Sequence, residues 1–317
     1  MAKICRFVAA QLFLLASPAA NASQSSAEPI VVKGTRIEPA EARQRAVEFI
    51  KRAGVAKGGK QVARWVVPIC IKVIGIRDDQ AARFKQNMLG IAREARMDIA
   101  RAKCEPNITV SFTNDPKQVV HHIKTRQPNQ LRELSFADRE RVLTGDAPVR
   151  WWYSTQMLDR DGVKANNIST PSLSSGGGSG AQGTGSDPVS LPMNDGVTAT
   201  QQYNSGSNVR TPTVRSLYAA TVVVGAQKAD MPIEAIAAYA AMVALAEMDY
   251  YDPPPLDSIL GMFRPESTET ALTGWDLAFL KSLYRMPLDR RSRIQRGHLV
   301  NALLDERLPK ESTTKKP

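Results

Sequence analysis

Three carboxylates lie close together in the sequence, just after a long apolar run. They are Glu247, Asp249 and Asp252. Carboxylate oxygens are the ligands that hard cations prefer, and paired carboxylates also serve as the acid and base of glycosidases. The cluster therefore predicts an acidic site in an atypical hydrolase, either a peptidase or a glycosidase. The alternative is that these side chains only solvate the end of a helix.

The other groups that do chemistry are few and badly spaced for catalysis. His121 and His122 are adjacent, so on a helix they point about 100° apart, and His298 stands alone. The chain has no G-x-S-x-G nucleophile elbow, and its Gly-rich run at 176–180 lacks the lysine of a phosphate-binding loop. From these residues we assign no catalytic residue, no metal site and no cofactor.

The first 22 residues have the order of a secretory signal peptide. Lys3 and Arg6 form a short positive region, an apolar run follows, and Ala20-Asn21-Ala22 matches a small-x-small cleavage site. No stretch of the chain approaches the roughly 20 apolar residues of a spanning helix. We expect cleavage near Ala22, no transmembrane segment after it, and a periplasmic or secreted protein. An uncleaved membrane anchor is the alternative.

Cleavage would leave two cysteines, Cys70 and Cys104, because Cys5 lies within the leader. Exported proteins with two cysteines most often pair them. A metal site on these cysteines is disfavoured, since no second cysteine pair and no well-spaced histidines accompany them. The sequence therefore predicts a disulfide between them.

Cleavage would also change the charge balance. The 42 basic and 31 acidic residues of the chain become 40 and 31, because the leader carries two basic residues and no acidic one, and the net charge becomes +9. Such a balance favours anionic envelope components as partners, although a scattered basic surface that only aids solubility is the alternative. We expect no nucleic-acid partner. The densest basic group comprises Arg290, Arg291, Arg293 and Arg296.

Differences in composition divide the mature chain into three parts. Residues 23–38 are expected to be extended, and Pro29–Arg36 within them resembles the TonB box, a strand through which outer-membrane transporters engage a partner. A single α/β domain is expected over 39–306, with a flexible Gly/Ser-rich loop at 165–212. The lysine-rich end, 307–317, is expected to be a disordered tail.

Hydrophobic periodicity predicts about four strands and several helices in this domain. The expected strands are Trp65–Ile74, Asn107–Thr113, Val149–Ser154 and Val214–Val224. Helices are expected to begin near Glu38, Asp78, Pro116, Ser135, Pro232, Thr273 and Ser292. Ser135 with Asp138 and Thr273 with Asp276 have the spacing of capping boxes. The fold class is therefore mixed α/β (α+β), with a backing helix and a small helical C-terminal end.

The helix expected from Pro232 is apolar on nearly every side from Ile236 to Ala246, which indicates a buried helix. Trp151 and Trp152 lie in the strand expected at Val149–Ser154. With Tyr239 of the buried helix they could line a ligand groove between that helix and the sheet. The alternative is that these aromatic rings simply fill the core.

The order of elements is similar to that of zincin-type metallopeptidase domains, in which a mixed sheet with a backing helix precedes an active-site helix and a C-terminal subdomain. Leu272–Tyr284 resembles the terminal helix of matrixin-type domains, which follows the pattern L-[ST]-x-x-D-x-x-x-[IL]-x-x-L-Y. The chain also looks like a group of uncharacterised exported proteins of proteobacteria, over most of 40–306. The resemblance implies a zincin-like scaffold.

The chain departs from that family where the metal would bind. A zincin needs H-E-x-x-H on its active-site helix, so that two histidines one turn apart hold zinc and the glutamate acts as base. The corresponding positions are Tyr239, Ala240 and Val243. The resemblance therefore implies a degenerate scaffold and a non-catalytic binding or envelope-associated domain in the periplasm. The alternative remains the hydrolase with an acidic site.

Overall fold

The computed structural model describes six ranges of the chain: 38–159, 210–211, 213–225, 231–250, 253–255 and 257–308. Four expectations therefore lie wholly or almost wholly outside the described residues. These are the signal peptide 1–22, the extended segment 23–38, the loop 165–212 and the tail 307–317.

The described residues form a mixed α/β fold with seven α-helices and one four-stranded sheet, which confirms the expected fold class at this level. The helices are α1 Pro39–Arg52, α2 Asp78–Glu94, α3 Pro116–Arg126, α4 Phe136–Thr144, α6 Ile233–Leu245, α7 Gly274–Arg285 and α8 Ser292–Arg307. The strands are β1 Ile71–Ile74, β2 Ile108–Thr113, β3 Val149–Leu158 and β4 Val214–Gly225. None of the described helices is long and apolar enough to cross a membrane.

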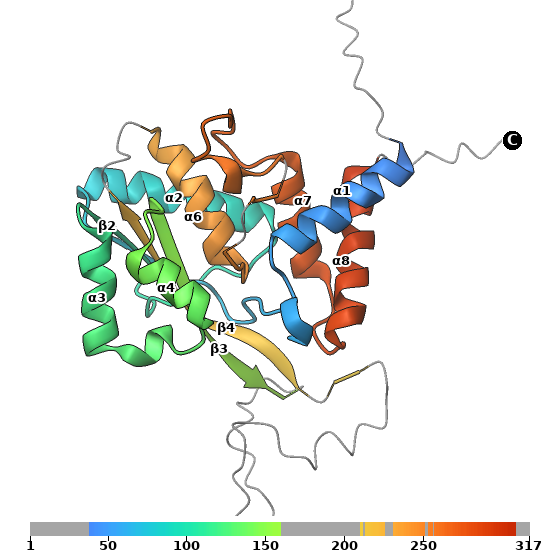
Figure 1. Cartoon of the computed structure of the whole chain (residues 1–317), viewed down its shortest axis with the longest axis horizontal. Coiled ribbons are helices and arrows are strands. Elements are labelled where there is room, and N and C mark those ends of the chain that lie inside the picture. Colours follow the sequence, from blue (N-terminus) through green and yellow to red (C-terminus); the bar gives the residue numbers. More distant parts are fainter. Residues whose placement is uncertain are drawn as a thin grey trace, which may run out of the picture. The chain divides into compact units, whose positions relative to one another are not determined.

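The strands lie in the order β1-β2-β4-β3. β1, β2 and β4 are parallel, and β3 is antiparallel to β4 at one edge. β3 and β4 are longer than β2 and continue beyond it as a two-stranded arm, which Figure 1 shows extending away from the helices. A register shift between Ser154 and Thr155 marks the start of this arm.

The first strand is shorter than expected. The sequence predicts Trp65–Ile74, but β1 begins only at Ile71. Pro68 has no N–H to donate, so the chain before Ile71 cannot continue the ladder of hydrogen bonds. It forms isolated bridges instead, one between Arg64 and Ser216 of β4 and one between Ile69 and Ile99.

Two apolar clusters cover the two faces of the sheet. The larger one joins α2 and α6 to alternate residues of β3 and β4, including Trp151, Tyr153 and Val222. The smaller one joins α3, α4 and Leu131 between them to Trp152 of β3 and Val223 of β4. The alternation follows from the period of two in a strand. In Figure 1, α1, α7 and α8 gather beyond one end of the sheet.

The helix α6 lies within the larger cluster, and its eleven residues from Ala235 to Leu245 are all buried. This confirms the expectation of a buried helix. The capping box at α7 is also confirmed, because Thr273 and Asp276 exchange side-chain and backbone hydrogen bonds. Asp276 is itself buried and accepts further bonds from Ser258 Oγ and the N–H of Ile259, which ties the start of α7 to the preceding loop.

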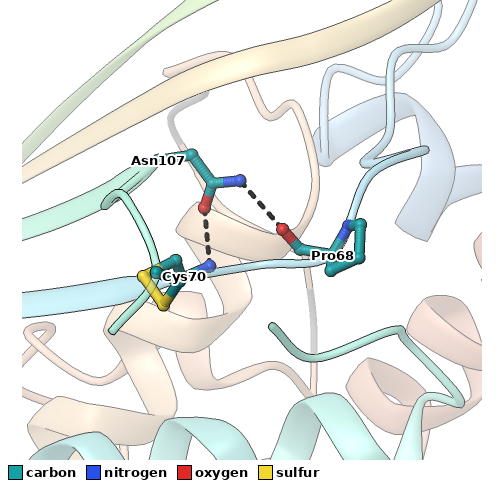
Figure 2. Close-up of a disulfide and its surroundings, with 4 residues drawn as sticks. Pro68, Cys70 and Asn107 are labelled. Carbon is teal, nitrogen blue, oxygen red and sulfur yellow. Dashed lines mark hydrogen bonds between the residues drawn. A yellow bond between two sulfur atoms is a disulfide. The ribbon is translucent and has the colours of Figure 1, made fainter. Parts of the chain in front are cut away.

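A disulfide joins Cys70 and Cys104, as the sequence predicts, with the two Cα atoms 6.0 Å apart. Figure 2 shows that the side chain of Asn107 also binds the segment that carries Cys70. Its oxygen accepts from the N–H of Cys70 at 2.7 Å, and its nitrogen donates to the carbonyl of Pro68 at 3.1 Å. The loop that ends at Cys104 is therefore held against the start of β1.

Removing this bond should destabilise the domain. It closes a loop across a sequence separation of 34 residues, so the chain-entropy relation gives a loss of about 3–4 kcal/mol in the free energy of unfolding for the double variant C70A/C104A. Urea unfolding of oxidised and reduced protein would measure it. The reducing agent should lower the stability of the wild type and leave the double variant unchanged. Equal stability of oxidised and reduced wild type would contradict the prediction.

Candidate functional site

The three aromatic residues expected to line one groove do not lie together. Trp151 and Tyr239 are in edge-to-face contact with ring centroids 6.2 Å apart. Trp152 faces the opposite side of the sheet, where it is 1% exposed and its indole N–H donates to Gln130. Neighbouring residues of a strand point to opposite faces, so the tryptophan pair could not line a single groove.

Aromatic side chains fill the space between α6 and the edge strand β3. Trp151 stacks on Tyr250 with centroids 3.9 Å apart, and Tyr239 packs on Phe263 at 5.0 Å. Trp151 and Tyr239 are each 7% exposed. Here the rings act as core, which was the alternative interpretation.

The residues that the zincin resemblance would align with the zinc motif are equally enclosed. Tyr239, Ala240 and Val243 are all buried. The histidines lie elsewhere, with His121 and His122 exposed on α3 and His298 exposed on α8. Within the described ranges no group of three or more His, Cys, Asp or Glu side chains is placed to hold a metal ion.

The carboxyl end of α6 is capped by aromatic donors. The single hydroxyl hydrogen of Tyr153 is shared between the carbonyls of Val243 and Ala246. The Trp65 indole N–H donates to the carbonyl of Ala244 at 2.9 Å, and the Tyr284 hydroxyl donates to that of Leu245. The last carbonyls of a helix have no partner within it, and burial here would otherwise leave them unsatisfied. These bonds set the direction in which the chain leaves the helix.

The chain that leaves α6 forms one wall of a cleft with a cavity volume of about 240 Å³. Glu247 and Asp249, two of the three carboxylates expected to form an acidic site, line it, while Asp252 lies outside the described residues. The other charged side chains that line the cleft are Lys57, Lys60, Glu133, Asp138 and Arg215.

An ion triad lies in the cleft. Arg215 of β4 forms a hydrogen-bonded ion pair with Glu247 and lies 3.5 Å from Glu133. Glu133 in turn accepts hydrogen bonds from the N–H and the hydroxyl of Thr155, both at 2.6 Å. The side chains of Arg215 and Glu247 are only 12% and 21% exposed. Because each charge has a partner, the triad can remain ionised away from bulk water.

Burial changes the pKa of one member of the triad, Glu247. Desolvation raises the pKa of the Glu247 carboxyl above the ordinary 4.5, and the charge of Arg215 opposes this rise. A carboxyl with a raised pKa is the type of group that can act as a general acid. The nearby Tyr153 hydroxyl, whose pKa burial raises well above its ordinary value, is committed to the end of α6.

The rim of the cleft carries a second ion pair, with Lys57 Nζ 3.4 Å from Asp249. The turn that carries Lys57 passes very close to Asp249. Gly54 has a φ of +71°, and a Cβ there would lie 2.5 Å from the Cβ of Asp249. Glycine is therefore required at this position both for its backbone conformation and for space.

Comparisons with protein-family models, with curated proteins and with solved structures found no match to this chain. The zincin resemblance accordingly stays a prediction. The function of the site must therefore be inferred from its geometry alone.

Sequence reasoning identified Glu247 and Asp249 but missed their partners. Arg215 lies 32 residues from Glu247 in the sequence, and the Glu133 side chain reaches it from the other side. A basic residue at the start of an apolar strand was the available signal, but its two partners depend on where α6 ends and on the pairing of β3 with β4.

The raised pKa predicts how stability depends on pH. A carboxyl whose pKa is higher in the folded than in the unfolded state contributes stability below its unfolded value, and that contribution is lost as pH rises through the folded value. Relative to E247Q, wild-type protein should therefore lose stability as pH increases from about 4.5. Urea unfolding from pH 4 to 8 would measure this, with E140Q, on the exposed surface of α4, as control. A difference that grows in favour of the wild type with rising pH would contradict the prediction.

Proposed function

We propose that the chain is an exported protein whose mature domain binds a small ligand without catalysis, on a degenerate metallopeptidase-like scaffold. Three observations support the scaffold. The sheet is mixed with an antiparallel edge strand, α6 is buried after β4, and α7 begins with the capping box of the matrixin-like motif. The residues at the zinc-ligand positions, Tyr239 and Val243, support the loss of metal chemistry.

The mixed charge of the cleft carries the proposal for the ligand. Carboxylates of Glu133, Asp138 and Asp249 face the same small volume as the ammonium groups of Lys57 and Lys60. A ligand that bears both an amine and a carboxylate could exchange the Lys57–Asp249 pair for two charge-assisted hydrogen bonds. The cavity volume of about 240 Å³ suits a ligand the size of a dipeptide. We therefore propose a short zwitterionic peptide.

Titration calorimetry with alanyl-alanine tests this proposal. Wild-type protein should bind it, whereas the blocked N-acetyl, C-amide dipeptide should not, because it lacks both charges. D249N and K57M should each weaken binding by about tenfold, the effect of one lost charge-assisted hydrogen bond. E140Q is the matched control and should bind like the wild type. Equal affinity for the free and the blocked dipeptide, or no binding of either, would refute the proposal.

The alternative function is a hydrolase, and the raised pKa of Glu247 favours it. Purified protein should then cleave a substrate in a peptidase or glycosidase panel, and E247Q should abolish that activity. D249N removes only the rim carboxylate and should retain the fold. Metal analysis of the same preparation supplies the second arm. Stoichiometric zinc, or activity that depends on Glu247, would overturn the non-catalytic proposal.

Export is supported by the leader sequence and by the disulfide, because disulfides persist in oxidising compartments. When the full chain is expressed in a Gram-negative host, the protein recovered from the periplasm should begin at Ser23 and have the mass of an oxidised pair of cysteines. Intact-mass spectrometry measures both. Cytoplasmic protein that retains residues 1–22 would show that the leader is not used.

A further inference from the structure

The edge strand β1 has an unpaired side. β1 is the outermost strand of the sheet and pairs only with β2. Ile108 donates to the carbonyl of Cys70, so Cys70 and every second residue after it face β2. Ile71 and Val73 therefore direct their N–H and C=O groups outward. On that side Ile69 is already bonded, because it donates to the carbonyl of Asp98 and accepts from the N–H of Ala100. Among the described strands none pairs with Ile71 and Val73 there, so these two residues offer a short template for another strand.

A cavity lies along the open side of β1. Its volume is about 600 Å³, and it is lined by residues of β1, by one side of α2 and by the loop that leads to Cys104. The Cys70–Cys104 disulfide and the bonds of Asn107 hold this loop against the start of β1 (Figure 2). The cavity is therefore bounded by covalently linked segments rather than by a free loop.

The charges that line this cavity all have one sign. Five cationic side chains line it and no carboxylate does: Lys72, Lys85, Arg93, Arg101 and Lys103. None of the five forms an ion pair with another described residue. Arg83, also on α2, behaves differently because it pairs with Glu234. Clustered cations repel one another, so their convergence on one cavity favours an anionic occupant.

Backbone and charge together indicate the class of ligand. A lysine on an edge strand commonly protects the edge from aggregation, and Lys72 alone would serve that purpose. The four further cations come from α2 and from the loop, outside the strand. A simple anion would use these charges but not the outward N–H and C=O groups of Ile71 and Val73. An extended peptide would use both, as in other cases of strand addition to a sheet edge.

We propose that the open edge of β1 binds an acidic, extended segment of a partner protein as an added strand. The backbone of the segment pairs with Ile71 and Val73. Its side chains alternate between the two faces of the sheet, so one set of carboxylates meets Lys85 and Arg93 of α2 and the other meets Lys72. Arg101 and Lys103 receive the end of the segment that lies over the disulfide-linked loop. This inference is independent of the cleft at the end of α6.

Fluorescence anisotropy tests the proposal on the mature, oxidised protein, with a labelled acidic peptide that carries glutamates at both odd and even positions and so presents carboxylates on both of its faces. The charge-reversal variant K85E/R93E should bind it at least about tenfold more weakly, and added salt should weaken the binding of the wild type. The matched control is K124E/R126E on α3, which makes the same charge change on exposed residues away from β1 and should bind like the wild type. Circular dichroism would verify that both variants fold.

A second peptide separates strand addition from simple anion binding. N-methylation of alternate residues removes the N–H groups that would bond β1 but leaves every carboxylate, so it should abolish binding. Retained binding of the methylated peptide would overturn the added strand and leave an anion site. Inorganic polyphosphate that competes as well as the peptide at equal charge would overturn it too. Equal binding by K85E/R93E and the wild type would show that these cations do not form the site.

Discussion

The buried carboxyl end of α6 is the constraint on which the other parts of the site depend. A helix that is apolar on all sides must end inside the core, where water does not reach its last carbonyls. Tyr153 of β3, Trp65 before β1 and Tyr284 of α7 supply the missing donors. Three parts of the chain therefore meet at one helix end, each through an aromatic ring that is apolar in its body and polar at its tip.

The same constraint positions the charged cleft. The chain leaves α6 in an extended conformation at Ala246, which brings Glu247 to Arg215 and Asp249 to the turn at Gly54. The cleft thus contains paired charges between rigid elements. Aromatic rings fill the space between the side of α6 and β3. Under the proposed function, recognition uses the end of the buried helix rather than its side.

The two proposed binding surfaces lie at opposite edges of the sheet. The cleft adjoins β3, while the basic cavity adjoins β1, and β2 and β4 separate them. They also differ in electrostatics, since the cleft carries both signs of charge and the cavity by β1 carries only cations. This basic cavity could not be predicted from the sequence, because Lys72, Lys85 and Lys103 are spread over more than one element. The arginine group near Arg290 had been the densest in the sequence.

Local patterns in the sequence determined the elements, the buried helix, the capping box at α7 and the cysteine pair, since each depends on periodicity, short spacing or the scarcity of a residue type. Even Trp151 and Trp152 could have been assigned to opposite faces from the period of a strand. The tertiary structure decided which distant charges meet: Arg215 with Glu247, Lys57 with Asp249, and the cations around β1. Those meetings depend on strand order and on the direction in which a helix ends, and both are set by packing between residues far apart in the chain.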